Sequence, residues 1–217
     1  MTTGISSTRR IYPVLVAIYS ATFLVSNINA SKGIQLGPFV LDAAFFLFPL
    51  SYIIGDILSE VYGYANSKLA VWTSFGITIG AVLCFYIGIW LPPADFYENQ
   101  DAFRTVLGLV PQIVLASLCG FAVGQLLNAW SLQVIKRRTG EKTMWARLLG
   151  STVVGQFGDT LIFCSIAASA IGISTAADFI NYTLVGFVWK VGMEAVMLPI
   201  TYRVIAFVKS KEDYQPA

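Results

Sequence analysis

Three long stretches of the chain contain no charged residue. The segments 11–31, 69–94 and 105–135 hold 21, 26 and 31 consecutive uncharged residues, most of them apolar. An α-helix rises about 1.5 Å per residue, so about 20 residues cross a hydrocarbon core of about 30 Å. The apolar residues run continuously instead of alternating with polar ones, which excludes the strands of a membrane β-barrel. The chain is therefore predicted to be a helical membrane protein.

The composition agrees with a membrane location and bounds the number of domains. Of the 217 residues, 56% are hydrophobic and 12% are charged, about half the charged fraction of an ordinary globular domain. The chain has three more apolar segments, which contain a few charged residues and lie between or after the three uncharged segments. We expect an all-α membrane protein with one domain over residues 1–217, a bundle of six transmembrane helices at about 11–31, 39–60, 69–92, 108–135, 148–171 and 180–208.

The charges between these segments predict the orientation. Basic residues fall on one side, at Arg9 and Arg10, at Lys68, in the segment KRRTGEK and near the carboxyl end, whereas the loop PPADFYENQD on the other side is acidic. By the positive-inside rule both termini are expected in the cytoplasm, in a bacterial inner membrane. The first apolar segment is longer than the core of a typical signal peptide, so we expect it to be retained.

Residue types that are rare or absent exclude several kinds of chemistry. The sequence has no histidine, which excludes His-based acid–base catalysis and removes the commonest metal ligand. Cys84, Cys119 and Cys164 each stand alone in an apolar run, as small hydrophobic residues do. Net charge is +2 and the basic residues are dispersed, so no nucleic-acid partner is expected. We expect no metal and no cofactor.

Five charged residues of the second, fifth and sixth predicted helices are candidates for a function: Asp56, Glu60, Asp159, Lys190 and Glu194. Each charge at the centre of a transmembrane helix costs about 2.5–3.5 kcal/mol on insertion scales, so such residues usually serve a function. Two structural alternatives stay open, because Glu60 can lie at the lipid headgroups and Lys190 can pair with either Glu194 or Asp159. Since four acids accompany one base, the surplus suggests a site for a cationic or hydrogen-bond-donating solute.

Polar and aromatic residues near these charges complete a candidate substrate site. Besides the five charged residues, it comprises Tyr52, Gln156, Asn27, Gln125, Asn128 and Trp189. Carboxylates would accept from the N–H edge of a flat heterocycle, amides would bond its carbonyl, and an aromatic ring would stack on its face. Gly120 and Gly124 have the spacing of a helix-packing motif.

Three stretches carry a resemblance to a known family: FPLSYIIGDILSEVYGYANSKLAVW at 48–72, GQFGDTLIF at 155–163 and WKVGMEAVMLPITYRV at 189–204. They resemble the queuosine precursor transporters, the vitamin uptake transporter family of six-helix membrane proteins. The resemblance implies uptake of 7-cyano- and 7-aminomethyl-7-deazaguanine for salvage into the tRNA nucleoside queuosine. It also implies that the family's acids correspond to Asp56, Glu60 and Asp159, and its helix-six lysine to Lys190.

Other functions were weighed against this one. A substrate-binding component of an energy-coupling-factor importer has a similar size, and Ala17 and Ala21 have a spacing suited to docking on a partner. An intramembrane aspartyl protease would need more helices and a full Gly-x-Gly-Asp motif, so we expect no enzyme. A lipid-organising protein would leave the buried charges unexplained. The expected partners are a purine-like small molecule and the lipid bilayer, and a homodimer stays open.

Overall fold

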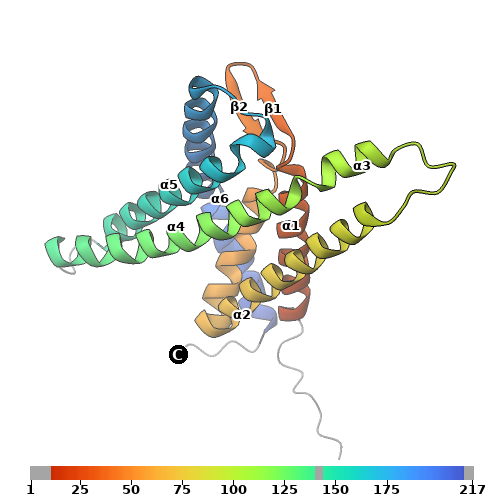
Figure 1. Ribbon diagram of the computed structural model, residues 1–217. Coiled ribbons are helices and arrows are strands. Elements are labelled where there is room, and N and C mark those ends of the chain that lie inside the picture. Colours follow the sequence, from red (N-terminus) through yellow and green to blue (C-terminus); the bar gives the residue numbers. More distant parts are fainter. Residues whose placement is uncertain (1–10, 140–143, 213–217) are drawn as a thin grey trace, which may run out of the picture.

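The computed structural model describes residues 11–139 and 144–212. Six helices and one β-hairpin follow each other along this part of the chain (Figure 1): α1 Tyr12–Asn29, β1 Gly33–Leu36, β2 Phe39–Asp42, α2 Phe48–Trp90, α3 Gln100–Leu107, α4 Val110–Thr139, α5 Met144–Ile171 and α6 Ala176–Lys211. The helical class predicted from the sequence is confirmed for most of the chain, and the hairpin was not predicted.

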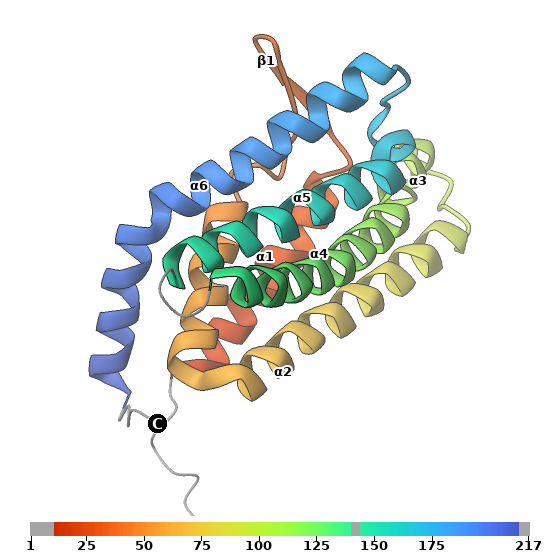
Figure 2. The same cartoon turned by 90° about the vertical axis from the view of Figure 1, so that its left-hand side faces the viewer.

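The hairpin β1–β2 lies at the end of the molecule opposite to the start of α1 and the end of α6 (Figures 1 and 2). Its two strands pair antiparallel, with Gly33 opposite Asp42, and Gly37 turns the chain with a φ of 62°. The helix predicted at 39–60 is therefore wrong over its first residues, which form β2 and a turn. The helix itself begins at Phe48, with Pro49 in its first turn, where the missing N–H of proline leaves no bond unmade.

The long helix α2 corrects a second prediction. Helices were expected at 39–60 and 69–92 with a loop around Lys68, but one helical element continues from Phe48 to Trp90. It is interrupted at Gly63, whose φ of 77° and ψ of 170° fall in a region that is essentially restricted to glycine. The two arms of α2 point in different directions on either side of this break (Figure 2). A single glycine thus replaces the expected loop.

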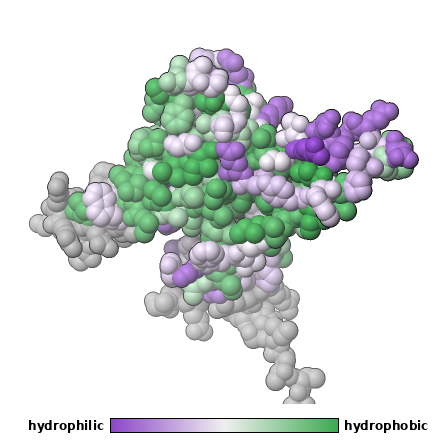
Figure 3. Space-filling view, in the orientation of Figure 1, coloured by the Kyte–Doolittle hydropathy of each residue, from purple (hydrophilic) through white to green (hydrophobic). Residues whose placement is uncertain are grey.

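Within the described residues, five helices are long and apolar enough to cross a membrane: Tyr12–Asn29, Phe48–Trp90, Gln100–Asn128, Gly150–Ile171 and Ala176–Lys211. The predicted number of six is wrong, because the second and third predicted helices are parts of α2. Figure 3 shows apolar residues spread over the middle of the face in view, with hydrophilic residues gathered around the α3 connection. Many large apolar side chains are not covered by protein, Trp72 and Leu126 among them, as expected for a surface that faces lipid.

The first residues of α1 and the last residues of α6 lie next to each other. The backbone N–H of Ile11 donates to Glu212 Oε1 at 2.7 Å, and the Tyr62 hydroxyl, beside the break in α2, donates to the same oxygen at 3.1 Å. Leu15, Ile57 and Ile205 pack in the hydrophobic core at this end. A separate small core lies toward the hairpin end.

Candidate functional site

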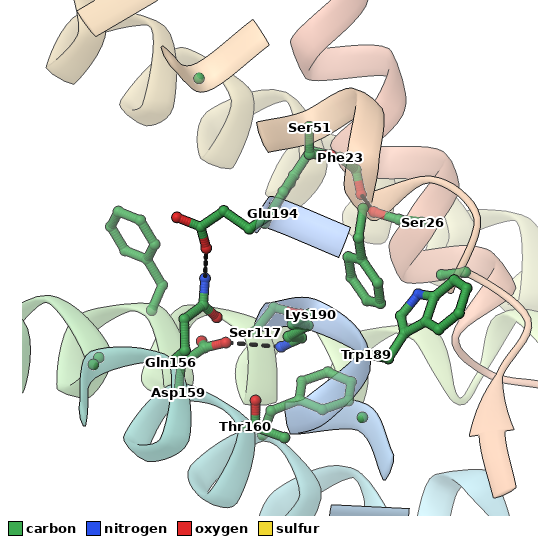
Figure 4. Close-up of a pocket in the computed structure, with 18 of the residues that line it drawn as sticks. Phe23, Ser26, Ser51, Ser117, Gln156, Asp159, Thr160, Trp189, Lys190 and Glu194 are labelled. Atoms are coloured by element: carbon green, nitrogen blue, oxygen red, sulfur yellow. Dashed lines mark hydrogen bonds and ion pairs between the residues drawn. The ribbon is translucent and has the colours of Figure 1, made fainter. Parts of the chain in front are cut away.

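A cavity of about 560 Å³ lies between the helices, lined by residues from α1, the hairpin segment, α2, α4, α5 and α6 (Figure 4). Nine of the residues predicted from the sequence line it: Asn27, Asp56, Gln125, Asn128, Gln156, Asp159, Trp189, Lys190 and Glu194. These residues come from five segments that are far apart in the sequence. The fold therefore brings most of the predicted site together in one place.

An ion pair between α5 and α6 lies in the wall of this cavity. Lys190 Nζ is 2.8 Å from Asp159 Oδ2, and the two side chains are 12% and 26% exposed. The ammonium also lies 5.2 Å from the centre of the Phe48 ring and 5.9 Å from that of Phe163, within range of cation–π attraction. Of the two alternatives left open by the sequence, pairing across helices is the one observed. Glu194 is not the partner of Lys190.

The position of Asp159 depends on two glycines of α4. A Cβ added at Gly120 would lie 2.8 Å from the Asp159 carbonyl oxygen, and one added at Gly124 would lie 2.9 Å from its Cβ. Gly155 approaches α4 equally closely from the other helix, where an added Cβ would lie 2.8 Å from the Cβ of Asn128. The small residues let the helices touch along their backbones, so the predicted packing role of Gly120 and Gly124 is confirmed.

Two further acids, Asp56 and Glu194, line a second part of the cavity. Glu194 Oε2 accepts a hydrogen bond from Gln156 Nε2 at 3.4 Å (Figure 4), and the carboxylates of Glu194 and Asp56 interact electrostatically. Among the residues that the structure describes, no lysine or arginine forms an ion pair with either acid. Two like charges without a base favour a cation or a proton beside them.

Two of the predicted amide and aromatic residues form hydrogen bonds with other protein groups instead of pointing free polar atoms at the cavity. Asn27 is buried, donates to the Phe23 carbonyl at 2.8 Å and accepts from the Ser117 hydroxyl at 2.7 Å, so it ties α1 to α4. Trp189 donates from its indole N–H to the Phe45 carbonyl at 3.1 Å. By contrast, the Oδ1 atom of Asn128 is buried without a hydrogen-bond partner among the described residues.

One predicted residue, Glu60, lies away from the cavity. Glu60 forms an ion pair with Lys209 at 2.8 Å near the end of α6, and its side chain is 59% exposed. It is absent from the cavity lining, as the interfacial alternative for this residue implied. The side chain of Tyr52 lies outside the described residues. The cysteines are free, with Cys164 buried and Cys84 exposed.

One acid of the cavity, Asp42, was not predicted from the sequence. Asp42 lies at the end of β2, is 6% exposed, and accepts hydrogen bonds from the Ala44 N–H and the Tyr182 hydroxyl, both at 2.8 Å. Burial raises the pKa of Asp42, while these two bonds and the charge of Lys190 lower it in part. The segment had been assigned to the entry of a helix. The Gly37–Pro38 turn between two short apolar runs would have indicated a hairpin instead.

Comparison with known families decides the class of the protein. The family described as "putative vitamin uptake transporter" matches residues 42–204, which include most of the cavity-lining residues. The chain belongs to this family. The predicted resemblance is therefore confirmed. A transporter of this family with several apolar helices is a multi-pass protein of a bacterial membrane, as the sequence predicted.

Individual relatives of this vitamin uptake transporter family member share about a quarter of its residues. A "Probable queuosine precursor transporter" of Bacillus subtilis is 26% identical over 188 residues, covering 86% of this chain and 81% of the relative. A "Queuosine precursor transporter" of Escherichia coli is 26% identical over 122 residues, covering 56% of this chain and 52% of the relative. A similar protein of Haemophilus influenzae is 25% identical over 120 residues, covering 55% and 48%. No solved structure matches the chain.

Proposed function

We propose that this protein is an uptake transporter for queuosine precursors, 7-cyano- and 7-aminomethyl-7-deazaguanine, and that it binds them in the central cavity. The relatives named as queuosine precursor transporters support the substrate class. The observation that carries the proposal is the charge of the cavity. Among the described residues that line it, four carboxylates, those of Asp42, Asp56, Asp159 and Glu194, accompany the single ammonium of Lys190.

The Asp159–Lys190 pair suits the guanine-like edge of a deazaguanine. That edge presents N–H donors beside a carbonyl acceptor, and the ion pair presents a carboxylate acceptor beside an ammonium donor at 2.8 Å. Charge-assisted hydrogen bonds of this kind are shorter and stronger than neutral ones. Asp159 would accept from the N–H groups while Lys190 donates to the carbonyl oxygen.

The Asp56–Glu194 part of the cavity suits the substituent at position 7. An aminomethyl group is a cation at neutral pH and would bind between two carboxylates that have no base of their own among the described residues. Gln156, which donates to Glu194, would donate to a cyano nitrogen when the substituent is neutral. Both substrates could therefore use one cavity.

Uptake by the purified full chain in proteoliposomes tests the proposal. We expect accumulation of radiolabelled 7-cyano-7-deazaguanine that is inhibited by the aminomethyl form and not by adenine or uracil, which lack the paired donor edge. Equal inhibition by the aminomethyl form, adenine and uracil would contradict the proposed specificity.

The same preparation separates this function from that of a substrate-binding component for an ATPase partner. Ala17 and Ala21 of α1 are both exposed, so the helix surface that would dock on a partner is not covered by other described parts of the chain. Binding of the precursors without uptake by the protein alone would favour that alternative. Uptake without any partner would exclude it.

Both termini are proposed to lie in the cytoplasm. The positive loop charges support this orientation, and the contact between Ile11 and Glu212 supports a common side for the two ends. With five membrane helices in the described part of the chain, a common side requires that the two arms of α2 cross the membrane separately, on either side of Gly63. A reporter fused after Ala217 should be active only in its cytoplasmic form. The opposite result would reverse the orientation.

A further inference from the structure

The carboxyl group of Asp42 stands apart from the other acids of the cavity. It lies on the hairpin, is 6% exposed, and lines the cavity. The hairpin is at the end of the molecule opposite to the first residues of α1 and the last residues of α6 (Figure 2). Oδ1 accepts from the Ala44 N–H and Oδ2 from the Tyr182 hydroxyl, each at 2.8 Å. Both bonds come from neutral donors.

Charged and titratable groups face Asp42 from two helices. Tyr182 and Lys190 interact with Asp42 from α6. On α5, Cys164 lies within electrostatic range of Asp42, Lys190 and Asp159. Lys190 is 2.8 Å from Asp159, and within the part of the chain that the structure describes Asp42 forms no ion pair. A carboxyl group that is buried without a fixed counter-ion changes its charge by taking up a proton. Burial also raises the pKa of Asp42.

The hairpin that carries Asp42 lines this end of the cavity and is held to α6 by Asn181. Asn181 Oδ1 accepts from the Val40 N–H, and its Nδ2 donates to the Pro38 carbonyl, both at 3.0 Å. The Tyr182–Asp42 bond is the next contact between the same two elements. The charge of Asp42 therefore acts directly on the contact between the hairpin and α6.

We propose that Asp42 is a proton-binding site that couples transport to the pH gradient, so that one proton enters with each substrate molecule. The inference rests on the proposed transport function. The ionised carboxylate takes a proton from the hairpin side and becomes a neutral acid, and Tyr182, which donates to the ionised form, accepts from the new O–H. The neutral acid favours the packed hairpin, and the proton leaves to the other side when the cavity opens there.

A purely structural role for Asp42 makes a different prediction. Its bond to the Ala44 N–H shapes the turn after β2, and an asparagine side chain can accept the same hydrogen bond. Asparagine cannot take up a proton. Asp42→Asn therefore keeps the turn and removes the titration.

The test uses proteoliposomes of the full chain and 7-cyano-7-deazaguanine, which carries no amine that would titrate. Exchange of labelled for unlabelled substrate at equal pH reports transport without coupling. A gradient of one pH unit, alkaline inside, should raise accumulation by up to about tenfold in the wild type, as one coupled proton allows. Asp42→Asn should abolish this gain, which is expressed relative to the variant's own rate of exchange at equal pH. Asp178→Asn, the same change at an exposed acid in the first turn of α6, should keep both.

Three results would overturn the inference: no gain from the gradient in the wild type, an unchanged gain in Asp42→Asn, or loss of the gain in Asp178→Asn. Wild-type exchange without any pH effect would overturn the inference alone, whereas the absence of wild-type exchange would overturn the transport proposal as well.

A second variant tests the inference even if Asp42→Asn fails to fold. Tyr182→Phe removes a hydrogen bond that lowers the pKa of Asp42, so the pH at which gradient-independent uptake is half-maximal should move to higher pH. An unchanged midpoint in a folded Tyr182→Phe protein would overturn the proposal.

Discussion

Two ion pairs of this protein have the same length and very different surroundings. Lys190 and Asp159 lie 2.8 Å apart in the wall of the cavity, with side chains 12% and 26% exposed. Lys209 and Glu60 also lie 2.8 Å apart, near the end of α6, with side chains 27% and 59% exposed. A charge in a buried site interacts more strongly with its partner than a charge at the surface. When the partner is removed, the buried charge that is left costs more free energy than an exposed one. Distance alone therefore says little about what each pair contributes.

The largest expected effect comes from removal of the cavity lysine. Lys190→Met leaves Asp159 without its ion-pair partner in a largely buried site, which should lower the free energy of unfolding by about 3–5 kcal/mol. Addition of Asp159→Asn should restore much of this loss, because the uncompensated charge is gone. Unfolding of the detergent-solubilised single and double variants by heat measures both effects. A Lys190→Met protein with unchanged thermal stability would show that the ammonium does not compensate the charge of Asp159.

A smaller effect is expected at the cavity acids that have no base. Asp56→Asn or Glu194→Gln should weaken binding of 7-aminomethyl-7-deazaguanine by about 1.5–3 kcal/mol, because each removes a charge-assisted interaction with the ammonium. Binding of the 7-cyano form should change less. Calorimetric titration of both compounds measures the difference, and Glu60→Gln serves as the matched control outside the cavity. Equal losses for the two compounds would place the ammonium elsewhere.

The smallest effect is expected at the exposed pair. Lys209→Met should lower the free energy of unfolding by about 0.2–1 kcal/mol, the range for surface ion pairs, and the loss should shrink further in high salt. Thermal unfolding at low and high salt provides the measurement. A loss as large as that of Lys190→Met would remove the distinction between the two pairs.

The candidate site could be predicted from the sequence to an unusual degree, because charges inside apolar helices stand out. Asp159, Lys190 and Glu194 were selected for that reason, and all three line the cavity. Asp42 escaped selection because it lies at the start of the helix predicted at 39–60, where an acid at the membrane surface needs no explanation. Its burial arises from the packing of the hairpin against α6, a contact between residues about 140 positions apart.

The number of helices was also not predictable from local sequence patterns. Both arms of α2 were recognised as apolar segments, but their connection was not, because sequence composition around Lys68 resembles a loop. The backbone at Gly63 can break a helix without a loop, since glycine adopts a positive φ at little cost. Nothing in the residue pattern distinguishes this glycine from Gly55 or Gly76, which lie in regular helix.

By itself the sequence determined that the chain is a helical membrane protein with a small set of buried charges. Long apolar runs and the free-energy cost of a charge in lipid depend only on residue type, so both can be recognised without coordinates. The tertiary structure decided the partner of each charged group: Lys190 pairs with Asp159, Glu60 pairs with Lys209, and Asp42 accepts from the Tyr182 hydroxyl. These partners are set by how α2, α5, α6 and the hairpin pack against each other. That packing joins residues distant along the chain, which local patterns do not encode.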